Sequence, residues 1–331
     1  MIETYGYARA GFLGNPSDGY FGKTLSFAFS NFRARVLLYP SGRLEIKPSK
    51  VDLPVFENLD DLYRITRWRG YYGGIRIIQA LIVRLVDYCR EQGIELPDRN
   101  FTLEYESSVP QRLGLGGSSA IITASLRALC QYYNLEIPLP VFANLVLETE
   151  TRELNVPAGL QDRVIQTYQG LVYMDFSRRL MEERGYGAYE KMDASLLPKV
   201  YVAYRTSLSE GTEVFHNNLR ERWRRGDPEV VGAMETWAGY AEEGRSCLLR
   251  GDHEKLKQLV NANFDLRAKI YQIDRGNLEM VHAARDVGAT SNFAGSGGAI
   301  VGTYEDEKMF DRLVERMQPA GVAVIKPRIV G

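Results

Sequence analysis

The stretch at residues 109–120 reads V-P-Q-R-L-G-L-G-G-S-S-A. Before it, at 101–106, apolar and polar residues alternate as in a β-strand, and after it the segment 121–133 is helix-like. A glycine-rich loop that leads into a helix lets backbone N–H groups approach an anion, and the helix start adds unpaired N–H donors and the positive end of its dipole. The sequence therefore predicts a phosphate-binding loop, whose backbone donors are Leu113, Gly114, Leu115, Gly116, Gly117, Ser118 and Ser119.

The loop differs from two better-known phosphate motifs. A Walker A loop needs Gly-Lys-Ser/Thr, and residues 109–120 contain no lysine. A dinucleotide fingerprint needs a third glycine at the position that Ser119 occupies. Serine hydroxyls at a helix start can bind the Mg²⁺ that accompanies ATP. Taken alone, the loop is equally compatible with a tight strand-to-helix turn capped by serine.

Composition excludes several classes of protein. The chain has 331 residues, of which 45% are hydrophobic and 25% charged, with a formal net charge of −1. This is typical of a globular protein with one or two domains, and it gives no electrostatic reason to expect nucleic acid as a partner. The apolar run at 75–86 is interrupted by Arg76 and Arg84, so we expect no membrane segment.

The cysteines and histidines do not form local motifs. Cys89, Cys130 and Cys247 are widely spaced in apolar, helix-like segments, so we expect buried thiols rather than disulfides or a metal site. The three histidines are too dispersed for a sequence-local zinc site. The first residues carry no signal-peptide pattern, so a cytoplasmic location is expected.

Periodicity predicts alternating strands and helices. We expect strands at 2–11, 24–47, 101–106, 199–205, 299–304 and 322–326, and helices at 75–92, 120–133, 141–154, 211–225, 228–250, 253–273, 276–287 and 307–317. Segment 164–174 is expected to begin as a helix and end as a strand. Segment 48–58 is predicted to be irregular. Charges, glycines and a proline at 178–198 suggest a boundary between domains at 1–190 and 191–331.

Three further segments carry polar side chains suited to a substrate site. Residues 7–22 read Y-A-R-A-G-F-L-G-N-P-S-D-G-Y-F-G, in which Asn15 and Asp18 can bind hydroxyl groups, although a simple turn is the alternative. In residues 148–163, E-T-E-T-R-E-L-N-V-P-A-G-L-Q-D-R, a Pro-Ala-Gly break separates Glu150 from Asp162 and can turn Asp162 back towards the phosphates. Residues 292–298, N-F-A-G-S-G-G, form a second glycine-serine loop.

Together these motifs resemble the GHMP kinase superfamily of small-molecule kinases. The resemblance rests on P-x-x-x-G-L-G-x-S-S-A, on an N-terminal R-x-x-x-L-G-x-x-x-D, on a Glu twelve residues before an Asp, and on a C-terminal G-S-G-G. Within the superfamily the chain is most similar to plant-type glucuronokinases, through the stretches 7–24, 70–76, 158–166, 170–177 and 293–299.

The resemblance implies an α/β fold with two domains. The N-terminal domain is expected to resemble ribosomal protein S5 domain 2, and the C-terminal domain to be ferredoxin-like. It also implies four roles: Asp162 as the catalytic base, Glu150 as its metal-binding partner together with Ser119, Arg9 as the cation beside the reacting hydroxyl, and Asp18 as a sugar-binding residue. Where galactokinases have Glu-His, this chain has Asn15-Pro16, which argues against galactose.

The implied reaction uses ATP and Mg²⁺ to phosphorylate the anomeric hydroxyl of D-glucuronate. A carboxylate substrate needs a cationic partner, preferably a bidentate arginine. Arg76, beside Tyr71 and Tyr72, and Arg163, beside Asp162, are the candidates. A surface ion pair on helix 75–92 is an equal alternative for Arg76.

Two other functions remain open from the sequence. The first is a GHMP kinase for galacturonate, L-arabinose or a heptose phosphate, since epimers differ by one hydroxyl. The second is a non-catalytic sugar-binding regulator with the same fold. The presence of Arg9, Ser119, Glu150 and Asp162 argues against the regulator. The sequence does not indicate an oligomeric state.

Overall fold

The computed structural model describes residues 1–48, 73–206 and 213–331, which form two compact units. The described parts of 1–7, 32–109 and 117–167 make the first unit, and those of 8–31, 110–116 and 168–331 make the second. Strands β1 (Ile2–Leu13) and β2 (Lys23–Pro40) each contribute residues to both units. Because this grouping follows packing rather than position along the chain, the domain boundary at residue 190 stays a prediction.

In the first unit, part of β2 lies in a sheet with β4 (Phe101–Ser107) and β3 (Glu45–Lys47). β4 pairs antiparallel with β2, so that Tyr105 faces Val36, and it pairs parallel with β3, where Leu103 faces Ile46. The sequence predicted one strand over 24–47, which is wrong, since the chain turns at 41–44 and returns on the other side of β4. Segment 49–58 lies outside the described residues.

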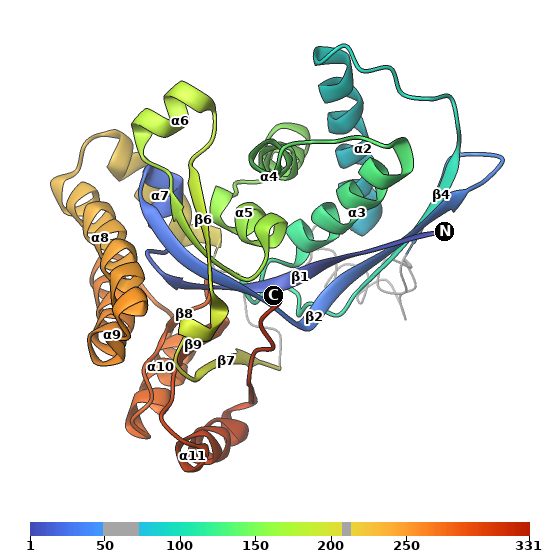
Figure 1. Cartoon of the computed structure of the whole chain (residues 1–331). Coiled ribbons are helices and arrows are strands. Elements are labelled where there is room, and N and C mark those ends of the chain that lie inside the picture. The colour runs from blue at the N-terminus through green and yellow to red at the C-terminus, as the bar shows by residue number, and fades with distance from the viewer. Residues whose placement is uncertain (49–72, 207–212) are drawn as a thin grey trace, which may run out of the picture. The chain divides into compact units, whose positions relative to one another are not determined.

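Helices α2 (Gly74–Glu91), α3 (Gly117–Tyr133) and α4 (Leu139–Glu148) pack together in the first unit (Figure 1). α2 buries Ile77, Leu81 and Leu85 along one stripe, as the helical spacing predicts. α4 continues into a π-helical turn (Thr149–Glu153) instead of the single helix predicted over 141–154. α5 (Leu160–Tyr168) then follows the Pro-Ala-Gly break.

In the second unit, the remaining part of β2 pairs antiparallel with β5 (Leu171–Asp175), which pairs antiparallel with β6 (Ala188–Met192). Helix α6 (Arg178–Arg184) connects β5 to β6, so segment 178–198 is more regular than predicted. Most residues of β6 are exposed, so its sequence lacks the alternation of apolar and polar residues that indicates a strand. For this reason the sequence of β6 suggested a linker. Short 3-10 turns occur at Ser17–Tyr20, Ala194–Leu196 and Gln318–Ala320.

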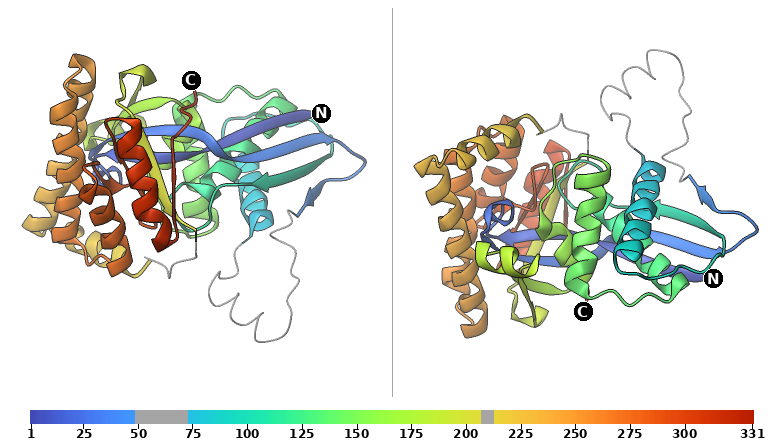
Figure 2. Two further views of the ribbon diagram at one scale, coloured as in Figure 1. Left: turned by 90° about the horizontal axis from the view of Figure 1, so that it is seen from below. Right: turned by 90° about the horizontal axis from the view of Figure 1, so that it is seen from above.

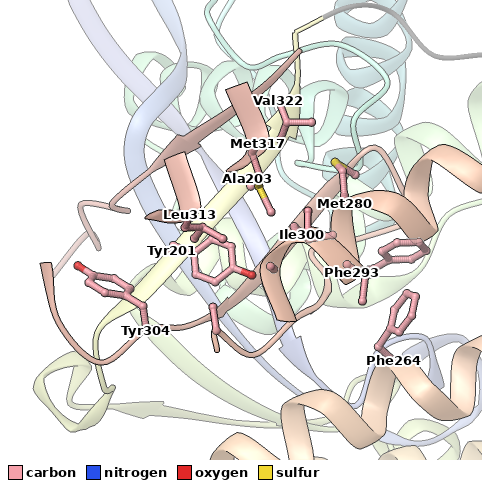
Figure 3. Packing of buried hydrophobic residues seen from close by; sticks show 14 of the residues in the cluster. Tyr201, Ala203, Phe264, Met280, Phe293, Ile300, Tyr304, Leu313, Met317 and Val322 are labelled. Atoms are coloured by element: carbon pink, nitrogen blue, oxygen red, sulfur yellow. The ribbon is translucent and has the colours of Figure 1, made fainter. Parts of the chain in front are cut away.

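Another sheet of the second unit has the described strand order β10-β7-β9-β8, and all of its pairings are antiparallel. Its strands are β7 (Val200–Arg205), β8 (Asn292–Phe293), β9 (Ala299–Thr303) and β10 (Val322–Ile325). Helices α10 (Arg275–Asp286) and α11 (Glu307–Met317) pack on it. Figure 3 shows the core that the sheet and these helices share, in which Tyr201 and Ile300 of the sheet and Met280 and Leu313 of the helices belong to one buried cluster.

The longest helices of the second unit are α8 (Pro228–Arg250) and α9 (His253–Ile270), which lie side by side in both views of Figure 2. Gly251, with φ +70°, ends α8, and the Asp252 side chain caps α9 by accepting from the Lys255 N–H at 3.1 Å. α7 (Glu213–Arg224) precedes them, and residues 211–212 of the helix predicted there lie outside the described residues. Among the described residues, no helix has both the length and the apolar composition needed to span a bilayer.

Candidate active site

The predicted phosphate loop has the backbone geometry that its glycines suggested. Gly114 and Gly116 have φ of +61° and +77°, a left-handed conformation that glycine adopts without strain. The loop leads directly into α3, which begins at Gly117, so Ser118 and Ser119 lie in the first helical turn. The N–H groups of a first turn have no partners within their helix, and they suit an anion.

A connected polar group follows in the first unit, on three elements. The Ser118 hydroxyl on α3 donates to Oε1 of Glu150 at 2.6 Å. Glu150 lies on the π-helical turn and is 2% exposed. Nε of Arg163, on α5, donates to Glu150 Oε2 at 2.8 Å, and Nη2 of Arg163 donates to the same oxygen. π-helical turns are frequent at functional sites, and here the turn holds a buried carboxylate between a serine and an arginine.

Arg163 extends this group to Asp162. Its Nη1 donates to the Gly159 carbonyl at 2.9 Å and lies 3.4 Å from Oδ2 of Asp162. The structure therefore connects Ser118, Glu150, Arg163 and Asp162, three of which the sequence proposed for metal, substrate or catalysis. The hydroxyl that contacts Glu150 is that of Ser118. Ser119 is 1% exposed, and its role in binding a metal ion stays a prediction. The guanidinium of Arg163 already contacts Glu150, the Gly159 carbonyl and Asp162. These contacts favour a role in orienting the two carboxylates over direct binding of a substrate.

In the second unit, Arg9 joins the two glycine loops. Nη1 of Arg9 donates to the Ala294 carbonyl at 2.8 Å and also to the Gly114 carbonyl, and the Arg9 N–H donates to the Leu115 carbonyl at 3.2 Å. Packing between the loops is tight, because a Cβ on Gly295 would lie 2.2 Å from the Gly114 oxygen. The C-terminal glycine-serine loop thus lies against the predicted phosphate loop.

Asn15 and Asp18 lie beside this second loop. The Asn15 amide donates to the Gly295 carbonyl at 3.2 Å, and the Asn15 carbonyl accepts from the Asn263 side chain at 3.1 Å. Asp18 is half-buried in the 3-10 turn Ser17–Tyr20. Asn15 therefore belongs to a polar network, whereas Asp18 lies in a turn, and their roles in binding hydroxyl groups stay predictions.

Sequence reasoning missed Arg267 of α9. This arginine is 2% exposed, and its Nη1 donates to the Gly295 carbonyl at 2.9 Å, the same oxygen that Asn15 contacts. The pattern that could have revealed it is the apolar stripe of α9, in which Leu256, Val260 and Phe264 are spaced by four residues and Arg267 follows after three. A charged residue in that stripe is expected to be buried.

The other predicted arginine, Arg76, lies on the exposed face of α2. Its neighbours Tyr71 and Tyr72 lie outside the described residues.

A hollow of about 660 Å³ near the C-terminal end of α3 is lined by Arg127, Cys130 and Phe142 among others, and no predicted site residue lines it. Cys89, Cys130 and Cys247 are free thiols, of which Cys130 is only half-buried.

Comparison with known proteins finds relatives that are similar in sequence and solved structures that are similar in fold. Residues 80–170 match the family described as GHMP kinases N terminal domain. Glucuronokinase 1 of Arabidopsis thaliana is 46% identical over 306 residues, which are 91% of this chain and 84% of that protein. The mevalonate kinase of Methanococcus jannaschii superposes with a TM-score of 0.74 at 16% identity, covering 100% of this chain and 98% of the other. The Lactococcus lactis galactokinase, solved with galactose, gives a TM-score of 0.75 at 15% identity over 99% and 93%.

The similarity in fold gives the class of the protein, and the similarity in sequence gives its family. The two solved structures have the fold of the GHMP kinases, and this fold is also that of the chain. By its identity to the Arabidopsis protein, the chain belongs to the glucuronokinase-like sugar kinases of the GHMP superfamily. The resemblance drawn from the motifs and the predicted fold class are confirmed. The protein is a sugar kinase, and ATP is its co-substrate.

Proposed function

We propose that the protein transfers the γ-phosphoryl group of ATP to the anomeric hydroxyl of D-glucuronate and forms glucuronate 1-phosphate. The observation that carries the proposal is the connected group of Ser118, Glu150, Arg163 and Asp162, which begins in the first turn of α3. The name of the Arabidopsis relative, at 46% identity, supports glucuronate as the sugar.

The phosphates of ATP are assigned to the backbone N–H groups of residues 113–119. Glycine lets the loop carry N–H groups close to an anion, and the dipole of the 17-residue helix α3 adds favourable charge at its start. Phosphoryl transfer depends mainly on positioning and on stabilising negative charge, which an array of fixed N–H donors supplies.

Mg²⁺ is assigned to the carboxylate of Glu150 and to a serine hydroxyl, from Ser119 or Ser118. The donor set fits this ion, which binds oxygen ligands and is commonly held by one or two carboxylates together with substrate phosphates. In the described parts of the chain, no group of three or more His, Cys, Asp and Glu side chains forms a metal site. The ion, when bound, neutralises charge on the phosphate oxygens.

Asp162 is proposed to accept the proton of the attacking hydroxyl. Arg163 lies 3.4 Å from its Oδ2, and this contact can orient the carboxylate that would act as the base. Arg9 is proposed to stabilise the charge that develops on the reacting oxygens. Its Nη1 is already fixed by the carbonyls of Gly114 and Ala294, so its position costs little reorganisation during the reaction.

The sugar hydroxyls are assigned to Asn15 and Asp18, because a carboxylate and an amide accept hydrogen bonds from hydroxyl groups. For the substrate carboxylate, Arg76 and Arg163 stay the predictions that the sequence made. We place the reaction in the cytoplasm, where the three free thiols of the chain suit a reducing environment.

A panel of sugars tests this proposal. Purified protein is incubated with ATP and Mg²⁺ and with D-glucuronate, D-galacturonate, L-arabinose or a heptose phosphate, and ADP formation is measured. We expect the highest kcat/KM with D-glucuronate. A higher value with another sugar would reassign the substrate, and no ADP formation with any of them would favour a non-catalytic regulator.

A further inference from the structure

One buried cation of the second unit has no role in the scheme above. Arg267 is 2% exposed, and its guanidinium carbon lies 5.4 Å from the ring centre of Tyr271 and 5.2 Å from that of Phe293. Among the described residues, it forms no ion pair with an Asp or Glu. Its Nη1 donates a hydrogen bond to the backbone carbonyl of Gly295. Burial lowers the pKa of Arg267, which reflects the cost of keeping this charge away from water.

Among the described residues, two other buried arginines and the half-buried Arg127 are neutralised or satisfied in a different way. Arg84 forms ion pairs with Glu91 at 2.8 Å and with Glu148 at 3.1 Å, and Arg163 pairs with Glu150. Arg127 donates to three backbone carbonyls through its two terminal nitrogens. A guanidinium has five N–H donors in a planar fork that matches a carboxylate. Arg267 forms no ion pair among the described residues, and Asp18 acts on it only beyond ion-pair distance, so its guanidinium has the capacity to bind an anionic partner.

The surroundings of Arg267 are those assigned to the sugar. The Gly295 carbonyl accepts from both Arg267 and Asn15, so these two side chains lie next to each other. Asp18 is near enough for its charge to favour the protonated form of Arg267. The Ala294 carbonyl, one residue away along the chain, accepts from Arg9. The carbonyls of Ala294 and Gly295 thus connect the cation to Asn15, proposed for the sugar, and to Arg9, proposed for the reacting oxygens, all in the second unit.

We propose that Arg267 is the residue that binds the carboxylate of the uronate substrate. This inference rests on the proposed function and replaces Arg76 and Arg163 in that one role. Arg163 is engaged by Glu150, and Arg76 lies on the exposed face of α2. The rings of Tyr271 and Phe293 hold the guanidinium in place, so that little side-chain entropy is lost when the carboxylate binds.

The test compares D-glucuronate with D-glucuronamide, which has the same ring and hydroxyls and a neutral amide at C6. Wild-type protein is expected to prefer glucuronate by at least roughly tenfold in kcat/KM, because the neutral amide leaves a buried cation unpaired. In Arg267→Met this preference should fall by about tenfold or more, mainly through a loss with glucuronate. Arg267→Lys keeps a charge without the planar fork and should give a preference for glucuronate between those of the wild-type protein and Arg267→Met.

Arg285→Met is the matched control. Arg285 lies 5.4 Å from the Phe264 ring and donates to the Ser291 carbonyl of the segment before the loop, but it pairs with Asp265 at 2.7 Å. Its loss should leave the preference for glucuronate unchanged.

The outcomes separate this inference from the proposed function. If Arg267→Met and Arg267→Lys lower kcat/KM equally for both sugars, Arg267 only supports the loop, and the inference is overturned while the glucuronokinase proposal stands. If the wild-type protein does not act on glucuronate at all, the proposed function fails, and the inference with it.

Discussion

Replacing Glu150 by Gln removes one charge from a buried ion pair. The side chains of Arg163 and Glu150 are 7% and 2% exposed, and Oε1 of Glu150 also accepts from Ser118. Glutamine has one acceptor oxygen where glutamate has two, so only one of the two positions that face Ser118 and Arg163 can still hold an acceptor. In either orientation of the neutral amide, Arg163 loses Glu150 as a counter-ion and keeps only the more distant Asp162, 3.4 Å away.

The expected cost follows from that burial. Removing one partner of a buried ion pair typically costs about 3–5 kcal/mol, because the other charge stays buried without compensation. Whole proteins are stable by only about 5–15 kcal/mol, so the loss is a large part of the total. Replacing both partners by apolar residues of similar size is often nearly neutral. Glu150→Met with Arg163→Met should therefore be more stable than Glu150→Met alone, while kinase activity stays lost in both.

Urea unfolding measures the change in stability, and hydrogen exchange of peptides from 117–133 and 149–168 locates it. Glu153→Gln is the control on the same π-helical turn, since Glu153 is exposed and should change stability by less than about 0.5 kcal/mol. A loss below about 1 kcal/mol in Glu150→Gln would refute the reasoning, because a pair that is truly desolvated cannot lose one charge so cheaply.

Three further experiments have defined outcomes. Asp162→Asn should keep ATP binding, measured by calorimetry, and lower kcat by roughly 10²-fold or more; near-normal turnover would remove Asp162 from the role of base. Gly295→Ala should raise the KM for ATP and lower the melting temperature, since its Cβ would lie 2.2 Å from the Gly114 oxygen. Gly239→Ala, on the exposed side of α8 with nothing within 4 Å, should instead stabilise by up to about 1 kcal/mol, and equal effects would count against the tight loop contact. Burial raises the pKa of Cys130 to about 12, so its alkylation at pH 8 should be more than about tenfold slower in folded than in unfolded protein, and equal rates would contradict that burial.

Elements with clear periodicity could be predicted from the sequence nearly to the residue. The helix predicted at 75–92 is α2 (Gly74–Glu91), and the one at 228–250 is α8 (Pro228–Arg250). Both have apolar residues at regular helical spacing and a recognisable start or end. Strand β6 was missed because it is short and largely exposed, and its pairing with β5 depends on a partner thirteen or more residues away in the chain.

Candidate site residues could be named from motifs, but their contacts could not. The hydrogen bond from Ser118 to Glu150 depends on how α3 and the π-helical turn pack, and adjacent serines look alike in the sequence. Arg163 looked free to bind a substrate because nothing in the sequence pairs it with Glu150, thirteen residues earlier. Arg267 was missed because an arginine near a helix C-terminus ordinarily faces solvent and stabilises the dipole. Burial of a charge is decided by tertiary packing.

The central claim concerns which oxygen of which sugar receives the phosphoryl group. Phosphorus NMR of the product formed from ATP and D-glucuronate answers this directly. We predict one phosphomonoester whose phosphorus couples to the anomeric proton, formed in a one-to-one ratio with ADP. A phosphorus signal coupled to a proton elsewhere on the sugar ring, or ADP formation without a sugar phosphate, would contradict the assignment of the protein as a glucuronate 1-kinase.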